Sequence, residues 1–216
     1  EFFYPHGQAV QDSSTSLQSE GKSQLFIHIH TDAGIEGLGI AQSSPGVRDV
    51  VEGGLKNILI GKDPLAIEKL WEDMFWGVRG YGRKGIAFLA ISGVDIGLWD
   101  LKSKFFEVPL YTLLGPYAEE VEIYGSGGWT NFSEDELVRE MTDYVQQGIP
   151  RVKMKVGKDF GKSEREDIER LAAVRKAVGD DVAIYIDANN GYYAKQAVYM
   201  AKEVENFQEG WFEEPV

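Results

Sequence analysis

The sequence predicts an α/β protein in which a small α+β unit precedes a parallel sheet covered by helices. Hydrophobic residues alternate over residues 24–42 and then recur at helical spacing as far as about residue 114. After Pro116, strand-like and helix-like segments alternate, with strand centres at Tyr124, Lys153, Ile186 and Phe212. These centres are 29, 33 and 26 residues apart, close to the roughly 30 residues of a strand–helix–strand unit. This repetition indicates a parallel sheet, and it fits both a closed (β/α)8 barrel and an open doubly wound sheet.

Length and charge exclude several classes of protein. The chain has 216 residues, which suggests one or two domains. It carries 22 Lys and Arg against 35 Asp and Glu, a net charge of −13, which argues against binding to nucleic acid or to an acidic membrane. No apolar run is long enough for a transmembrane helix, and the absence of cysteine excludes disulfides, thiolate nucleophiles and zinc–thiolate sites. The chain starts without Met and ends in a strand-like segment, so we expect it to be a fragment of a longer protein.

The first 115 residues read as one α+β domain. Residues 1–20 are polar and rich in Ser and Gln, which predicts a loop. Residues 24–42 predict a β-hairpin that turns at 31–34. Helices follow from about residue 46, and the one through Ile91 to Lys102 ends before Pro109.

The second predicted domain covers residues 116–216. We expect its strands over 121–125, 151–156, 183–188 and 211–214. We expect its helices over 133–147, 163–178 and 193–206. Ser133 and Glu136 have the spacing of a capping box, which marks where the first of these helices begins.

Polar side chains stand at three successive predicted strand ends. Lys153 and Lys155 share one face of their strand, whereas the residues between and beside them are apolar. Asp187 and Asn189 share a face at the end of the next strand, and Glu213 ends the last. The carboxyl ends of parallel strands are where α/β proteins place active sites. The alternatives are solvated lysines on an edge strand, a helix cap or turn for Asp187, and a salt bridge from Glu213 to a lysine.

These residue types suit metal-assisted proton abstraction. Two carboxylates from adjacent strands suit Mg²⁺, which takes six oxygen ligands, so we expect a further carboxylate beyond Val216. A lysine beside another cation and near a metal has a lowered pKa and can act as a base near neutral pH. Lys155 is the candidate base, and Lys153 would hold the substrate carboxylate and lower the pKa of its neighbour. The expected product of proton loss next to a carboxylate is an enediolate stabilised by Mg²⁺.

The order and spacing of these motifs resemble the enolase superfamily, and in particular its mandelate racemase / muconate lactonizing enzyme family (mandelate racemase subgroup). The motifs that carry the resemblance are Gly34–Gly39, Ile91–Asp100, Lys153-Met154-Lys155, Asp187-Ala188-Asn189 and Glu213-Glu214-Pro215. The resemblance implies an N-terminal α+β capping domain followed by the first part of a TIM-like (β/α)7β barrel. It implies that Lys155 is the general base, that Lys153 is its electrostatic partner and that Asp187 and Glu213 bind Mg²⁺, with Asn189 as a second-shell or substrate-contacting residue.

The same resemblance implies an enzyme acting on a small carboxylate, most simply an acid-sugar dehydratase. The alternatives are a racemase, epimerase or cycloisomerase of the same superfamily, or a noncatalytic acid-binding α/β protein. A third metal ligand and a second acid/base are absent from this chain, since its three histidines all precede residue 31. Related enzymes are often oligomers, so we expect a homo-oligomer, acting in the cytoplasm without a nucleic-acid or membrane partner.

Three other patterns have plainer explanations. Residues 157–163 resemble a phosphate-binding loop but have three residues between the glycines instead of four, so we expect a loop capped by Ser163. The glycines at 125–128 predict a flexible loop. His28 and His30 share one strand face, which predicts a solvated sheet surface.

Overall fold

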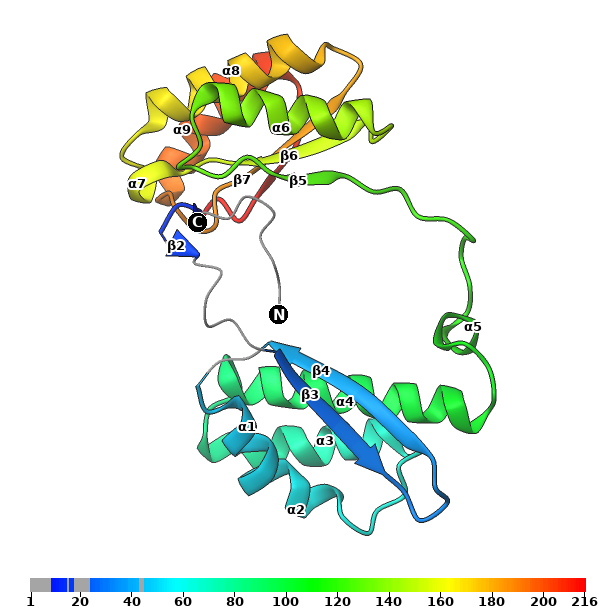
Figure 1. Cartoon of the computed structure of the whole chain (residues 1–216). Coiled ribbons are helices and arrows are strands. Elements are labelled where there is room, and N and C mark those ends of the chain that lie inside the picture. Colours follow the sequence, from blue (N-terminus) through cyan, green and yellow to red (C-terminus); the bar gives the residue numbers. More distant parts are fainter. Residues whose placement is uncertain (1–8, 15, 18–23, 43–44) are drawn as a thin grey trace. The chain divides into compact units, whose positions relative to one another are not determined.

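A computed structural model describes residues 9–14, 16–17, 24–42 and 45–216 of the chain (Figure 1). The chain divides into two compact units. One spans residues 21–119, and the other spans residues 120–216 together with the described residues before 18. In the described part of the chain, no helix is both long and apolar enough to cross a lipid bilayer.

The first unit is a two-stranded antiparallel sheet packed against helices. Strands β3 (Gln24–His30) and β4 (Glu36–Gln42) pair along their full length, which confirms the predicted hairpin. The helical segments are α1 (Val47–Val50), η1 (Val51–Leu55), α2 (Lys56–Leu59), α3 (Ile67–Gly77), η2 (Val78–Gly80), α4 (Ile86–Phe105) and α5 (Leu110–Leu114). Ile27 and Ala41 face a core with Leu98, Ile91 and other apolar side chains of α4.

Glycines let the backbones of β4 and α4 touch. A Cβ on Gly39 would stand 1.9 Å from the Gly93 carbonyl oxygen, and one on Gly37 would stand 2.1 Å from that of Gly97. Neither distance is possible for real atoms, so the close approach requires glycine at these strand positions.

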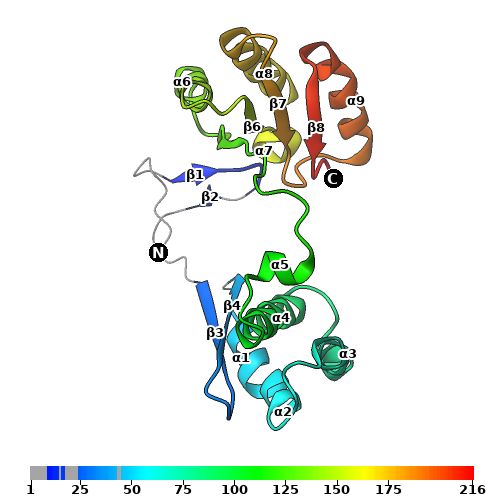
Figure 2. The ribbon, with the colours of Figure 1, turned by 90° about the vertical axis from the view of Figure 1, so that its right-hand side faces the viewer.

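The second unit is a four-stranded parallel sheet covered by helices on one face (Figures 1 and 2). The strands are β5 (Gly125–Gly127), β6 (Arg151–Lys155), β7 (Ala183–Asp187) and β8 (Glu209–Glu213), side by side in that order. The helical segments are α6 (Glu134–Gln146), α7 (Lys158–Gly161), α8 (Glu164–Val178), α9 (Ala194–Val204) and η3 (Glu205–Phe207). The regular alternation predicted after Pro116 is therefore confirmed, and α6 begins at the predicted capping box of Ser133 and Glu136.

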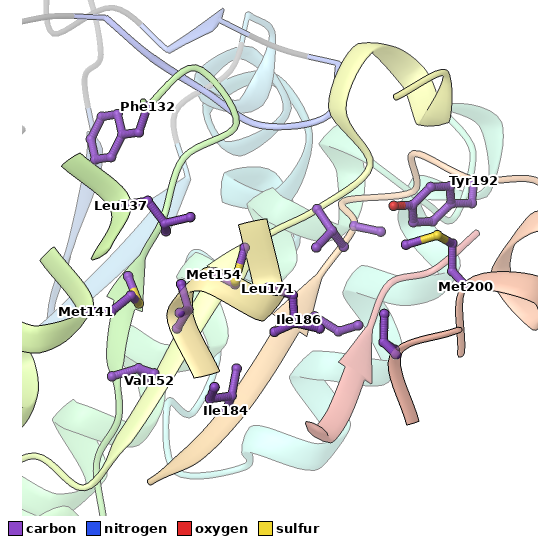
Figure 3. Packing of buried hydrophobic residues seen from close by; sticks show 14 of the residues in the cluster. Phe132, Leu137, Met141, Val152, Met154, Leu171, Ile184, Ile186, Tyr192 and Met200 are labelled. Atoms are coloured by element: carbon purple, nitrogen blue, oxygen red, sulfur yellow. The ribbon is translucent and has the colours of Figure 1, made fainter. Parts of the chain in front are cut away.

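The core of this unit lies between the sheet and its helices (Figure 3). Alternate residues of β6 and β7 supply the sheet side of the core: Val152, Met154, Ile184 and Ile186. The helices supply Leu137 and Met141 from α6, Leu171 and Val174 from α8, and Met200 and Val204 from α9. Because side chains alternate along a strand, the residues between these apolar ones must point to the other face of the sheet. Lys153, Lys155, Tyr185 and Asp187 are on that face.

Two local predictions were wrong. The first strand of the sheet is at 125–127 instead of 121–125, because ladder pairing starts where Gly125 meets Val152, and Val121 is left 83% exposed. The predicted N-terminal loop contains a short hairpin, β1 (Val10–Gln11) with β2 (Ser16–Leu17), while residues 1–8 lie outside the described part. Val10 is fully buried in the core of the second unit, and this anchors the hairpin there.

Candidate active site

Strand register brings three of the predicted site residues into one row. Lys155 on β6 pairs with Asp187 on β7, and Asp187 pairs with Glu213 on β8. The strands are parallel, so all three residues lie at the carboxyl edge of the sheet, on the face away from the helices. Lys153 lies two residues before Lys155 on β6 and therefore on the same face of the strand.

The four side chains form a cluster of alternating charges in which Lys153 and Asp187 are buried. The Lys155 ammonium lies 2.5 Å from Asp187 Oδ2, and the Lys153 ammonium lies 2.7 Å from Glu213 Oε2 and 3.5 Å from Asp187 Oδ2. The Asp187 side chain is 2% exposed and the Lys153 side chain 7%, whereas that of Glu213 is 36% exposed. β6 is a central strand, so the alternative of solvated lysines on an edge is wrong. The alternative of a lysine salt bridge to Glu213 does describe one contact, that with Lys153.

The carboxylates keep Lys153 charged. Burial by itself would lower the pKa of Lys153, but the hydrogen bond to Glu213 and the negative charges of Asp187 and Glu213 outweigh burial and raise that pKa.

Asn189 completes the carboxylate end of β7. Its backbone adopts a positive φ of 42°, and its N–H donates to Asp187 Oδ1 at 2.9 Å, so Asp187 also serves as a turn residue. The side-chain nitrogen Nδ2 of Asn189 donates to Glu214 Oε2 at 3.3 Å. Asn189 Oδ1 is buried and has no hydrogen-bond partner among the described residues. A buried oxygen without a donor is costly, and this one is available to a cation or a substrate hydroxyl.

Aromatic rings border the lysines, and three of them, Tyr124, Tyr185 and Trp211, were missed as site residues in the sequence. Tyr185 and Trp211 stack with centroids 3.8 Å apart, and Tyr124 meets both edge-on. The Lys153 ammonium lies 5.2 Å from the Tyr124 ring, and that of Lys155 lies 5.6 Å from the Trp129 ring. A signal was present, because Tyr185 and Trp211 each precede a site carboxylate by two residues and so must share its face.

The glycines before Trp129 lie in close packing and residues 125–127 form strand β5, so the prediction of a flexible loop was wrong. A Cβ on Gly125 would stand 2.2 Å from the Tyr144 ring, and one on Gly127 would stand 2.4 Å from the Glu140 carboxylate. Gly128 has a φ of +63° and touches Met154.

The loop after β6 is closed by the protein's own side chains. The N–H of Gly157 donates to Asp167 Oδ2 at 3.0 Å and to the Tyr192 hydroxyl at 2.9 Å. Burial raises the pKa of Asp167, and burial together with the Asp167 charge raises that of Tyr192. Asp167 therefore occupies the Gly157 N–H that a phosphate would need. The predicted cap of α8 by Ser163 was wrong. The Ser163 hydroxyl makes no side-chain cap hydrogen bond and donates to Asp159 instead.

The oxygen donors of the site suit a hard divalent cation in kind. Asp187, Glu213 and the orphaned Oδ1 of Asn189 are all oxygen ligands of the type Mg²⁺ takes. Within the described ranges, no three histidine or carboxylate side chains cluster closely enough to hold a metal by themselves. The residues present therefore fit part of a magnesium site.

The fold and this lysine–carboxylate edge define an α/β protein with a capping unit and part of a parallel β/α barrel. The sequence profile described as "Mandelate racemase / muconate lactonizing enzyme, N-terminal domain" matches residues 6–115, and that described as "Enolase C-terminal domain-like" matches residues 136–216. The chain belongs to the mandelate racemase / muconate lactonizing enzyme family of the enolase superfamily. The predicted family and fold class are thereby confirmed, and the open doubly wound alternative is excluded.

Three relatives illustrate the match. Arabinonate dehydratase of Saccharolobus solfataricus is 36% identical over 97% of this chain and 58% of its own length. The crystal structure of a Streptomyces coelicolor racemase with bound magnesium has a TM-score of 0.88 at 30% identity, covering 97% of this chain and 58% of that one. That of L-talarate dehydratase from a Polaromonas species, complexed with Mg and L-glucarate, has a TM-score of 0.82 at 34% identity, covering 96% and 57%. The chain thus spans a little over half the length of these relatives.

Proposed function

We propose that the protein removes the α-proton of a carboxylate substrate with the help of Mg²⁺, and that it is an acid-sugar dehydratase. The observation that carries this proposal is the row Lys155, Asp187 and Glu213 on three adjacent strands, with Lys155 Nζ 2.5 Å from the Asp187 carboxylate. A base and two metal-ligating carboxylates within one row can act on a single bound molecule.

Each residue has a distinct role in the proposal. Lys155, once neutral, accepts the α-proton at Nζ, and Lys153 stays an ammonium that orients the substrate carboxylate. Asp187 and Glu213 would hold Mg²⁺, and Asn189 would present its free Oδ1 to the metal or to a substrate hydroxyl. When bound, Mg²⁺ supplies positive charge, which would stabilise the additional negative charge of the enediolate relative to the carboxylate substrate.

Dehydration follows if the carbanionic product expels the hydroxyl group on the neighbouring carbon. The similarity to arabinonate dehydratase and L-talarate dehydratase supports this outcome. The second candidate is racemisation or epimerisation, supported by the similarity to the Streptomyces racemase. Both begin with the same proton transfer and differ in the acid that completes the reaction. Cytoplasmic location and assembly into a homo-oligomer stay predictions.

Isotope exchange tests the proposal in the full-length protein. With Mg²⁺ and arabinonate, L-talarate or galactarate in D₂O, the wild type should exchange the substrate α-hydrogen or release water, as followed by NMR. Lys155→Ala should abolish both. Lys158→Ala is the matched control, because Lys158 lies three residues away and its partner is Glu166, outside the row.

Two results would contradict the proposal. Exchange that persists in Lys155→Ala refutes the base assignment. If the wild-type protein binds no Mg²⁺ by calorimetry and turns over none of the acids, the result favours a noncatalytic acid-binding protein, the alternative raised by the sequence. Asp187→Asn and Glu213→Gln should each weaken Mg²⁺ binding, and unchanged binding in both refutes the ligand assignment.

A further inference from the structure

We propose that Asp167 and Arg170 on α8 are positioning residues that together fix Lys155 and Trp129 at the carboxyl edge of the sheet. The two side chains are almost completely buried, at 0% and 4% exposure, and both hydrogen-bond to the backbone of loops that follow β5 and β6. They lie three residues apart and so share one face of the helix. The proposal rests on the function assigned to Lys155 and adds the residues that hold it in place.

Asp167 holds the loop that follows Lys155. Its Oδ2 accepts the Gly157 N–H at 3.0 Å and the Tyr192 hydroxyl at 2.7 Å, and its Oδ1 accepts the Lys158 N–H at 3.4 Å. Gly157 is only two residues beyond Lys155, and its φ of +80° lets the chain turn away from the sheet there. The carboxylate thus supplies an acceptor to a backbone N–H beyond the end of β6, where the ladder has ended.

Arg170 holds the loop that carries Trp129. Its guanidinium donates to the carbonyl oxygens of Phe132 at 2.6 Å, Trp129 at 2.8 Å and Gly128 at 3.3 Å. These three carbonyls lie in the turn between β5 and α6. One rigid fork therefore fixes the backbone on which the Trp129 ring approaches the Lys155 ammonium.

The two contacts meet at the backbone of Lys155. The Gly128 carbonyl that Arg170 contacts also accepts the Lys155 N–H at 3.1 Å. Lys155 is thus tied on one side to the loop held by Arg170 and, two residues later, to the carboxylate of Asp167. A displacement of about 1 Å at a reacting group can cost about a hundredfold in rate, so such ties matter to a base.

Stability alone is a poor reason for this pair of charges. Burying a carboxylate and a guanidinium is costly, and apolar residues of the same volume often stabilise a core as well or better. Unlike apolar side chains, these two charged side chains can form hydrogen bonds to backbone N–H and C=O groups, and so they fix the positions of two loops.

The same helix offers a matched control. Arg175, five residues beyond Arg170, donates to the carbonyls of Phe207 at 2.9 Å, Val182 at 2.6 Å and Gly179 at 2.8 Å. These groups precede β7 and β8, so Arg175 holds loops at the opposite edge of the sheet. It is the same residue type with the same kind of contacts, but away from Lys155.

The experiment compares Arg170→Met with Arg175→Met in the full-length protein. Hydrogen exchange should rise in peptides covering 128–132 and 155–158 for the first variant, and in those covering 179–182 and 207–208 for the second. With the acid that the wild type turns over, Arg170→Met should lower kcat of α-hydrogen exchange by at least about tenfold with little change in KM, as expected when a base is misplaced. Arg175→Met should leave kcat within about twofold even if its Tm falls equally. Binding of Mg²⁺ alone should persist in both.

Equal losses of kcat in the two variants, or an unchanged kcat in Arg170→Met, would overturn the proposal. If Arg170→Met does not fold, Arg170→Lys and Asp167→Asn take its place, and the same kcat comparison decides. Failure of the proposed function is a separate outcome, in which the wild type exchanges no substrate hydrogen. In that case the peptide pattern decides, and an Arg170 variant that leaves 155–158 protected overturns the link to Lys155.

Discussion

Neutralising Asp187 should destabilise the metal-free protein more than neutralising any other member of the charge cluster. Its carboxylate is 2% exposed and contacts two ammonium groups, at 2.5 Å and 3.5 Å. Asp187→Asn keeps the shape but leaves both buried ammonium groups with Glu213 as the remaining carboxylate of the cluster. Removing one partner of a buried pair costs about 3–5 kcal/mol, so we expect a loss of that size.

Glu213→Gln is the control for burial. The Glu213 side chain is 36% exposed, so water screens its contact with Lys153 and the expected loss is smaller, about 1–2 kcal/mol. The double variant Lys155→Met with Asp187→Asn should recover part of the loss, because it removes both members of the closest pair.

Urea unfolding of the full-length protein in EDTA, followed by circular dichroism, measures these differences. Losses for Asp187→Asn and Glu213→Gln that agree within error would refute the reasoning, since the burial of Asp187 would then have no energetic effect. A double variant less stable than Asp187→Asn alone would show that Lys155 is not the partner that matters.

Two further predictions concern the first unit. Gly39→Ala should lower the free energy of unfolding by about 1–3 kcal/mol or more, because its Cβ would stand 1.9 Å from the Gly93 carbonyl oxygen. Gly53→Ala meets no atom within 4 Å and should raise that free energy by about 0.4–1 kcal/mol. Thermal unfolding measures both changes, and equal effects would contradict the packing argument. Burial would raise the pKa of Asp100, but hydrogen bonds from Lys104 and from a β4 backbone N–H lower it. A lowered folded-state pKa contributes stability that is present above the unfolded value of about 3.9 and is lost as the pH falls through the folded value. Asp100→Asn should therefore reduce stability at pH 7 and have little effect at pH 2, and a difference that is constant with pH would contradict this.

The row of site residues could be predicted because it depends on two simple regularities. Side chains alternate along a strand, which places Lys153 with Lys155. Parallel strands end at one edge, which places Lys155, Asp187 and Glu213 side by side. Both rules need only the positions and directions of the strands, so they apply without knowledge of the other contacts in the molecule. Asn189 follows the end of β7 at a positive φ of 42°, so strand alternation does not place it.

Contacts between distant segments could not be predicted in the same way. Residues 121–125 alternate like a strand, but the sheet starts pairing at Gly125, and β-propensity carries no information on where the partner strand begins. Asp167 and Arg170 look like ordinary charges of an exposed helix, since α8 is rich in both signs. Their function in the loops appears only when the fold brings residues 128–132 and 157 to that helix.

The charge of the cluster makes the proposed acid site compatible with a net charge of −13. Lys153 and Lys155 balance Asp187 and Glu213, so the four groups together are neutral. A divalent cation bound to the two carboxylates would compete with the ammonium groups for the same oxygens and would leave the site with a net charge of +2. Surface charges beyond about 8–10 Å are screened by salt and do not offset this local excess. A bound acid anion would reduce this excess of positive charge, so the cluster should bind cation and acid more tightly together than either alone, and calorimetric titration of Mg²⁺ with and without the acid should show that coupling.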